Sequence, residues 1–165
     1  MNIIPKIVSY SRMIKLSHTI FALPFALSAA ILAHRVTPVT SQKLFWIIIA
    51  MFGARSAAMG FNRLADASVD AENPRTAVRE IPRGVISKAD ASIFVVLSAL
   101  LFMIAAANLS SLCFLLSFPV LAVLCFYSYA KRFTWLTHII LGFSIGLAPL
   151  AVWIAVNGDV SWKIG

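Results

Sequence analysis

The chain has 165 residues, of which 61% are hydrophobic and only 12% are charged, and its mean hydropathy is +0.91. Soluble domains carry roughly 25% charged residues, so this composition excludes an ordinary soluble protein and predicts an integral membrane protein. The 14 Lys and Arg residues against 6 Asp and Glu give a formal net charge of +8. They lack the interleaved aromatic residues of a nucleic-acid-binding surface, so we expect the lipid bilayer, and no nucleic acid, as their partner.

The apolar runs predict an all-α fold, a polytopic membrane helical bundle, because a bilayer-spanning helix needs roughly 20 residues. Residues 3–15 place apolar and basic side chains on different sides of a helix, which is typical of an interfacial helix. The next apolar run is too long for a signal-peptide core, so we expect it to be retained. The polar turn at residues 108–111 divides the longest run into two. We therefore expect five spans, at about 16–34, 43–61, 90–108, 111–130 and 135–156.

The basic residues are divided unevenly between the two sides of the membrane. Ten of the 14 Lys and Arg residues fall on the side of the N-terminus, whereas Arg35, Lys43 and Lys163 fall on the other side. The positive-inside rule then predicts a cytoplasmic N-terminus in a multi-pass protein of the cell inner (plasma) membrane. The connection between the second and third spans also faces the cytoplasm in this orientation.

Charge is concentrated in residues 62–84, which hold four of the 6 acidic residues and four of the 14 basic residues. If the second span continues as a helix to residue 70, then Asn62, Asp66 and Asp70 lie on one face, within about 80° of arc. Mg²⁺ prefers carboxylate and amide oxygens and usually keeps open positions for substrate phosphates. The spacing predicts a three-ligand Mg²⁺ site, and the simpler interpretation is a solvated acidic helix end.

Arginine residues follow this acidic face along the chain. Asn73-Pro74 is expected to break the helix. Arg75 and Arg79 come next at four-residue spacing, which places them on one face of a helical turn if residues 75–81 form one. Guanidinium groups suit phosphate oxygens, so the two arginines are candidates for a phosphate-bearing ligand.

Further polar residues enter the spans from the cytoplasmic side. Arg55 lies well inside the second span and on the same helix face as the acidic residues, where an arginine normally faces a partner or a wet cavity. Lys15 and His18 begin the first span, and Tyr127 and Lys131 are i, i+4 neighbours at the end of the fourth. We expect these residues to line a substrate pocket; snorkelling cations and an interfacial aromatic belt are the simpler interpretations.

Three segments resemble motifs of the UbiA family of intramembrane prenyltransferases. Residues 62–70 resemble the family's N-D-x-x-D-x-x-x-D, residues 75–79 its R-T-x-x-R, and residues 127–131 its Y-x-x-x-K. The similarity covers the whole chain. It is closest to the 4-hydroxybenzoate polyprenyltransferase-like branch, which reads N-R at the first two motif positions.

The resemblance implies a helical bundle that binds a polyprenyl diphosphate through Mg²⁺ and transfers the prenyl group to an aromatic acid acceptor. The acceptor would be 4-hydroxybenzoate in ubiquinone biosynthesis, or a naphthoate-type precursor in menaquinone biosynthesis. The implied site consists of Asn62, Asp66 and Asp70 as catalytic metal ligands and of Arg75, Arg79 and Lys131 as diphosphate ligands.

The chain departs from the family pattern in two ways. Arg63 replaces the acidic second residue of the first motif, so we expect weaker metal binding or direct phosphate binding. The family also has about nine helices and a second aspartate motif between the sixth and seventh. We therefore expect residues 1–165 to be the N-terminal portion of one domain, inactive without a C-terminal half.

Two other classes of membrane protein also place charged residues at the predicted cytoplasmic end of a spanning helix. A CDP-alcohol phosphotransferase requires D-G-x-x-A-R between its carboxylates, which residues 66–71 lack. A small transporter or scaffold could use Arg55 and the acidic residues as an ion path. Diphosphate binding that requires Mg²⁺ separates the prenyltransferase from the transporter.

Overall fold

The computed structural model describes residues 3–130, 133, 135 and 137–158. Within these residues the secondary structure is entirely helical. The helices are α1 (Ile3–Met13), α2 (Leu16–His34), α3 (Ser41–Glu72), α4 (Lys88–Leu109), α5 (Ser111–Ala130) and α6 (Thr137–Asn157). The expected all-α membrane bundle is therefore confirmed.

Four described helices, α3 to α6, are long and apolar enough to cross a membrane. The first expected span corresponds to α2, in which the described apolar stretch is the shorter Leu23–His34. The second span continues without interruption to Glu72, so α3 carries the acidic residues beyond the apolar part of the helix. This continuation is what the predicted alignment of the acidic residues required.

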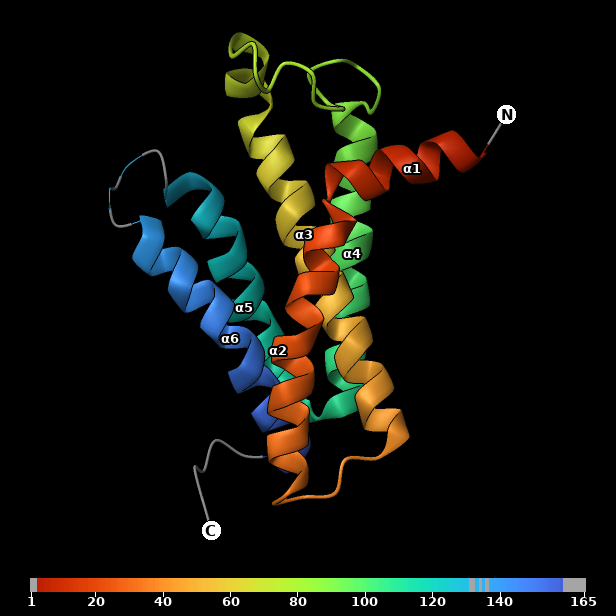
Figure 1. Cartoon of the computed structure of the whole chain (residues 1–165), viewed down its shortest axis with the longest axis vertical. Helices are drawn as coiled ribbons and strands as arrows, with labels where there is room; N and C mark the ends of the chain where they lie inside the picture. The colour runs from red at the N-terminus through yellow and green to blue at the C-terminus, as the bar shows by residue number, and fades with distance from the viewer. Residues whose placement is uncertain (1–2, 131–132, 134, 136, 159–165) are drawn as a thin grey trace.

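Most helices follow the long axis of the molecule, whereas α1 lies across them (Figure 1). The helix α3 lies beside α4, and α5 pairs with α6. At the end of the bundle near α1, the connection between α3 and α4 folds over the tip of α3. That α1 lies in the membrane interface stays a prediction.

The close approach of α3 to α4 depends on glycine. A Cβ atom at Gly53 would lie 2.8 Å from the Phe102 backbone nitrogen and 3.0 Å from the Ser98 carbonyl oxygen. Two turns further along, a Cβ at Gly60 would lie 2.8 Å from Val95 Cγ2. Small residues at such positions let helix backbones meet in a membrane, where van der Waals packing drives association.

Two groups of buried apolar residues hold the bundle together. The first lies far from α1 and joins α2, α3 and α6; it consists of Ala26, Ala29, Ala30, Ala33, Ile47, Val152, Ala155 and Val156. The second lies at the end of the bundle that the sequence predicts to face the cytoplasm, so we call it the cytoplasmic cluster; it consists of Met13, Ile14, Ala67, Ile81, Ile86 and Ala91. Because its members come from α1, α3, α4 and two connections, the cytoplasmic cluster fixes the α1–α2 corner and the α3–α4 connection against the end of α3.

The ends of α3 and α4 form where the sequence predicts them. Asn73 ends α3 in an extended conformation before Pro74. Ser87 caps α4, because its Oγ accepts a hydrogen bond from the Asp90 backbone nitrogen at 3.0 Å and donates one to Asp90 Oδ2 at 2.8 Å. Between these residues the chain forms turns, so the helical segment considered for residues 75–81 is not present.

Replacing Gly53 by alanine tests the close contact of α3 with α4. The added methyl group meets backbone atoms that cannot rotate away, so we expect the free energy of unfolding to fall by about 1–3 kcal/mol. Thermal unfolding in detergent micelles measures the change. Gly146→Ala is the matched control, because a Cβ there meets nothing within 4 Å. Equal effects of the two substitutions would contradict the packing.

Candidate active site

The C-terminal end of α3 buries two carboxylates within a mostly apolar chain. Asp66 and Asp70 are 9% and 6% exposed and lie one helical turn apart. Both belong to the buried face of α3, together with Ala67, which packs in the cytoplasmic cluster. Buried carboxylates require compensating charges or hydrogen bonds, so the neighbours of this acidic pair decide what it can bind.

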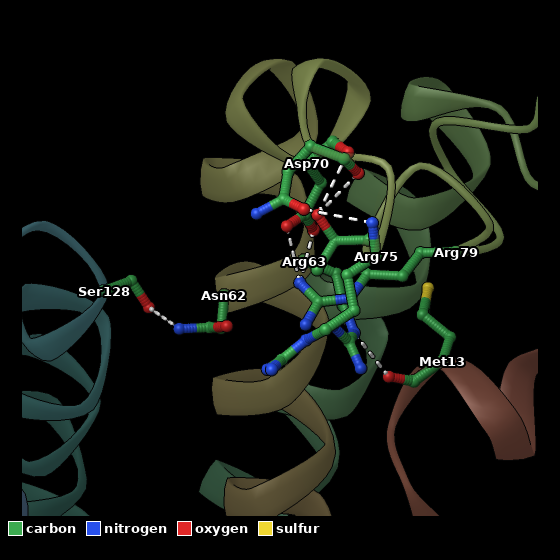
Figure 2. Close-up of polar contacts among 9 residues, drawn as sticks. Met13, Asn62, Arg63, Asp70, Arg75, Arg79 and Ser128 are labelled. Carbon is green, nitrogen blue, oxygen red and sulfur yellow. Dashed lines mark hydrogen bonds and ion pairs between the residues drawn. The ribbon is translucent and has the colours of Figure 1, made fainter.

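Asp70 has a close cationic partner. Arg79 Nη1 lies 2.6 Å from both carboxylate oxygens of Asp70, and Figure 2 shows the arginine reaching back from the connection to the helix. Thr76 strengthens this fold-back, because its Oγ1 donates to the Asp70 carbonyl oxygen at 3.1 Å. The connection therefore returns one arginine of the R-T-x-x-R segment to the acidic face.

Asn62 points to a different helix. Its Nδ2 donates a hydrogen bond to Ser128 Oγ at 3.3 Å, across the space between α3 and α5 (Figure 2). Ser128 is completely buried, so this bond links α3 to α5 near the acidic face. Asn62 and Asp70 therefore have partners on different elements: the Asn62 amide contacts α5, whereas the Asp70 carboxylate pairs with the connection between α3 and α4.

Arg63 is the functional candidate that the sequence reasoning underrated. The side chain is only 7% exposed, and its Nε donates to the Met13 carbonyl oxygen at 3.1 Å. Burial and repulsion by Arg79 disfavour its charge, whereas Glu80, Asp70 and Asp66 favour it. The sequence spacing could have shown that Arg63 lies on the same helix face as Asp70, because residues 63 and 70 lie within about 20° of each other around a helix.

Arg55 lies two helical turns from Asn62, towards the middle of the membrane. It is half-buried, and among the described residues its buried Nε has no hydrogen-bond partner. The hydroxyl of the neighbouring Ser56 is buried in the same unpartnered state. Unpaired donors at this depth are costly, so they are expected to face a polar ligand or water.

The other predicted site residues are not gathered at the acidic face. Arg75 is exposed and starts the turn, where its backbone nitrogen bonds to Asn73 Oδ1 at 3.0 Å. Lys15 lines an open hollow with neighbouring α1 and α2 residues, and Tyr127 is half-buried on α5. His18 lies in α2 with its side chain outside the described part, and Lys131 lies outside the described residues altogether.

The donor chemistry fits a hard divalent cation. Two carboxylates and one amide at i, i+4 and i+8 supply only oxygen ligands. In the described part of the chain, however, no three His, Cys, Asp or Glu side chains form a metal-binding group. Since Arg79 occupies both oxygens of Asp70, a metal ion at this face would have to share Asp70 with the arginine or displace it.

Comparison with known families gives one match over most of the chain. The UbiA prenyltransferase family matches residues 22–165. A 4-hydroxybenzoate octaprenyltransferase from Citrobacter koseri is 29% identical over 177 aligned positions, which cover 96% of this chain and 60% of the relative. The enzyme of the same name from Yersinia enterocolitica is 29% identical, covering 73% of this chain and 46% of the relative.

Solved structures give the same fold. The apo structure of a UbiA homologue from Aeropyrum pernix K1 is 36% identical and superposes with a TM-score of 0.81, covering 90% of this chain and 54% of that one. A digeranylgeranylglyceryl phosphate synthase superposes with a TM-score of 0.84 at 16% identity, which shows a shared fold alone. The chain thus spans about half the length of the relatives that it matches.

The ion pair between Asp70 and Arg79 can be tested without any ligand. Arg79→Gln leaves a buried carboxylate without its close cation, so we expect a loss of about 2 kcal/mol in the free energy of unfolding. Arg75→Gln removes the same charge from an exposed position and should change stability by less than about 0.5 kcal/mol. Thermal unfolding in low salt compares the two. A larger loss for the Arg75 variant would show that the pair does not form.

Proposed function

Since this chain belongs to the UbiA prenyltransferase family, we propose that it contributes the first diphosphate-binding half of an enzyme that transfers a polyprenyl group to an aromatic acid. The observation that carries the proposal is the pairing of a buried acidic face with the returning Arg79 at the C-terminal end of an apolar helix long enough to span a membrane. An acidic face alone repels a diphosphate. A face that combines acids and arginines can hold both a cation and the phosphates.

In the proposed complex, Asn62, Asp66 and Asp70 would hold Mg²⁺, and the bound ion would supply positive charge that makes the diphosphate a better leaving group. Arg79 can exchange the carboxylate of Asp70 for a phosphate oxygen, because both are anionic acceptors for the same guanidinium. Arg75 is exposed in the connection that returns Arg79 to the acidic face, so its side chain can approach the second phosphate. Lys131 would add a further positive charge from the end of the fourth span.

The reaction breaks the bond between the allylic carbon and the diphosphate oxygen and forms a bond between that carbon and an electron-rich ring carbon. The ring proton then leaves to a base. The protein contributes positive charge where the leaving group develops negative charge, and apolar helices that keep water from the allylic cation. Arg55 is placed to receive the acceptor's carboxylate, since its Nε is buried and unpartnered two turns below Asn62. His18, Lys15 and Tyr127 are further proposed pocket residues.

The acidic residues of α3 form one aspartate cluster, the first of the two that the family resemblance implies. The family resemblance implies a second aspartate pair, and the relatives are about twice as long as the stretch that matches them. We therefore propose that catalysis requires the chain together with the remaining helices of the fold. Binding of the diphosphate to the first cluster does not depend on them.

Binding of farnesyl diphosphate to the chain in lipid nanodiscs tests the proposal, with and without Mg²⁺. We expect Mg²⁺ to increase affinity, and Asp66→Asn to reduce the Mg²⁺-dependent affinity by at least about tenfold, because a metal-ligating carboxylate is lost. Asp90→Asn is the matched control, since Asp90 bonds to Ser87 at the start of α4 and is no predicted metal ligand. Mg²⁺-independent binding that is equal in all three proteins would refute the site.

The choice of acceptor and the competing transporter function need separate measurements. Membranes that contain the chain and its C-terminal complement, supplied with octaprenyl diphosphate, are expected to prenylate 4-hydroxybenzoate, as the names of the relatives indicate. Prenylation of a dihydroxynaphthoate and not of 4-hydroxybenzoate would support the menaquinone alternative. Ion flux in liposomes without any affinity for the diphosphate would support the transporter and contradict the enzyme.

A further inference from the structure

Arg63 connects two parts of the molecule that the proposed chemistry treats separately. Its backbone belongs to the acidic end of α3, and its Nε donates to the carbonyl oxygen of Met13 at 3.1 Å. Met13 is the last residue of α1, and the last carbonyl groups of a helix lack partners within the helix. The arginine therefore caps α1 from another helix.

The corner that receives this bond has an unusual backbone. Lys15 adopts the left-handed conformation with φ 49° and ψ 61°, which residues other than glycine rarely adopt. Met13 and Ile14 are 0% and 4% exposed, so the corner is packed into the cytoplasmic cluster. Such a conformation persists only when its surroundings enforce it, and the bond from Arg63 is one of those constraints.

The charge of Arg63 is needed at the acidic face. Asp66 and Asp70 are both buried, and Arg79 forms an ion pair with Asp70. This arginine supplies one positive charge against the two negative charges of the acidic pair. Arg63 lies about one helical turn before Asp66 and supplies a second positive charge, which burial and Arg79 disfavour and which Glu80, Asp70 and Asp66 favour. Figure 2 shows it below Asp70, on the side that faces Met13.

We propose that Arg63 is a positioning residue that keeps the acidic face assembled before any ligand binds and joins that face to the α1–α2 corner. The arginine at this motif position then acts as a built-in cation. It holds the two carboxylates close together where repulsion would otherwise separate them. The role of the face in binding Mg²⁺ and diphosphate rests on the proposed function, whereas the charge coupling and the capping of α1 do not.

A double-mutant cycle with Asp66 tests the charge coupling in the absence of Mg²⁺ and diphosphate. With Arg63 present, Asp66→Asn removes an attraction and should lower the unfolding midpoint. With Arg63→Gln, the same change removes a repulsion from Asp70 and should raise the midpoint, by on the order of 4 °C. Arg83→Gln, an exposed arginine of the same connection, is the control background, in which Asp66→Asn should behave as in the unmodified chain.

Hydrogen exchange of the full chain in nanodiscs tests the connection to α1. Arg63→Lys keeps the charge but loses the Nε donor, so we expect amides 13–17 to exchange about tenfold faster, with the unfolding midpoint nearly unchanged. Arg83→Gln should leave this exchange as it is. The lysine variant also covers the case in which Arg63→Gln fails to fold.

Two results would overturn the inference. One is an effect of Asp66→Asn that has the same sign and size with and without Arg63, because then no charge coupling exists. The other is unchanged exchange of amides 13–17 in Arg63→Lys. Both measurements are made without ligand. A failure of diphosphate binding would therefore refute the proposed function but not the role of Arg63. Likewise, a failure of these two measurements would refute the role of Arg63 but not the proposed function.

Discussion

The structure depends on the neutralisation of two buried carboxylates at the end of a membrane-spanning helix. Asp66 and Asp70 lie where the apolar part of α3 meets the connection to α4, and Arg79 bonds both oxygens of Asp70 at 2.6 Å. Burial raises the cost of any uncompensated charge. The connection must therefore fold back over α3, and the turns of residues 74–84 follow from this requirement.

The same constraint explains why the surrounding elements converge on one end of the bundle. The cytoplasmic cluster packs the α1–α2 corner, the connection and the start of α4 around Ala67, directly between the two acids in sequence. Glycine contacts at Gly53 and Gly60 bring α4 close enough to α3 for this packing. The hydrogen bond from Asn62 to Ser128 then connects α5 to the same end of α3. The site is thus held by four helices while its charges come from one helix and one connection.

Helix spacing and the break before Pro74 predicted much of this arrangement from the sequence. Helical periodicity placed Asp66 and Asp70 on one face, and the break at Asn73 was predicted because it depends on local backbone chemistry. The partners of Asn62 and Arg63 could not be predicted in the same way, because Ser128 and the Met13 carbonyl are brought near only by tertiary packing. The predicted roles of Lys131 and His18 remain predictions.

The most direct measurement of the central claim is an experimental structure of the chain with Mg²⁺ and a non-hydrolysable polyprenyl diphosphate analogue. The account predicts that the diphosphate lies against Arg75 and Arg79, with the metal ion between it and Asp66 and Asp70. Arg79 would then contact a phosphate oxygen in place of one oxygen of Asp70. A diphosphate bound elsewhere, with the pair of Asp70 and Arg79 unchanged, would contradict the account.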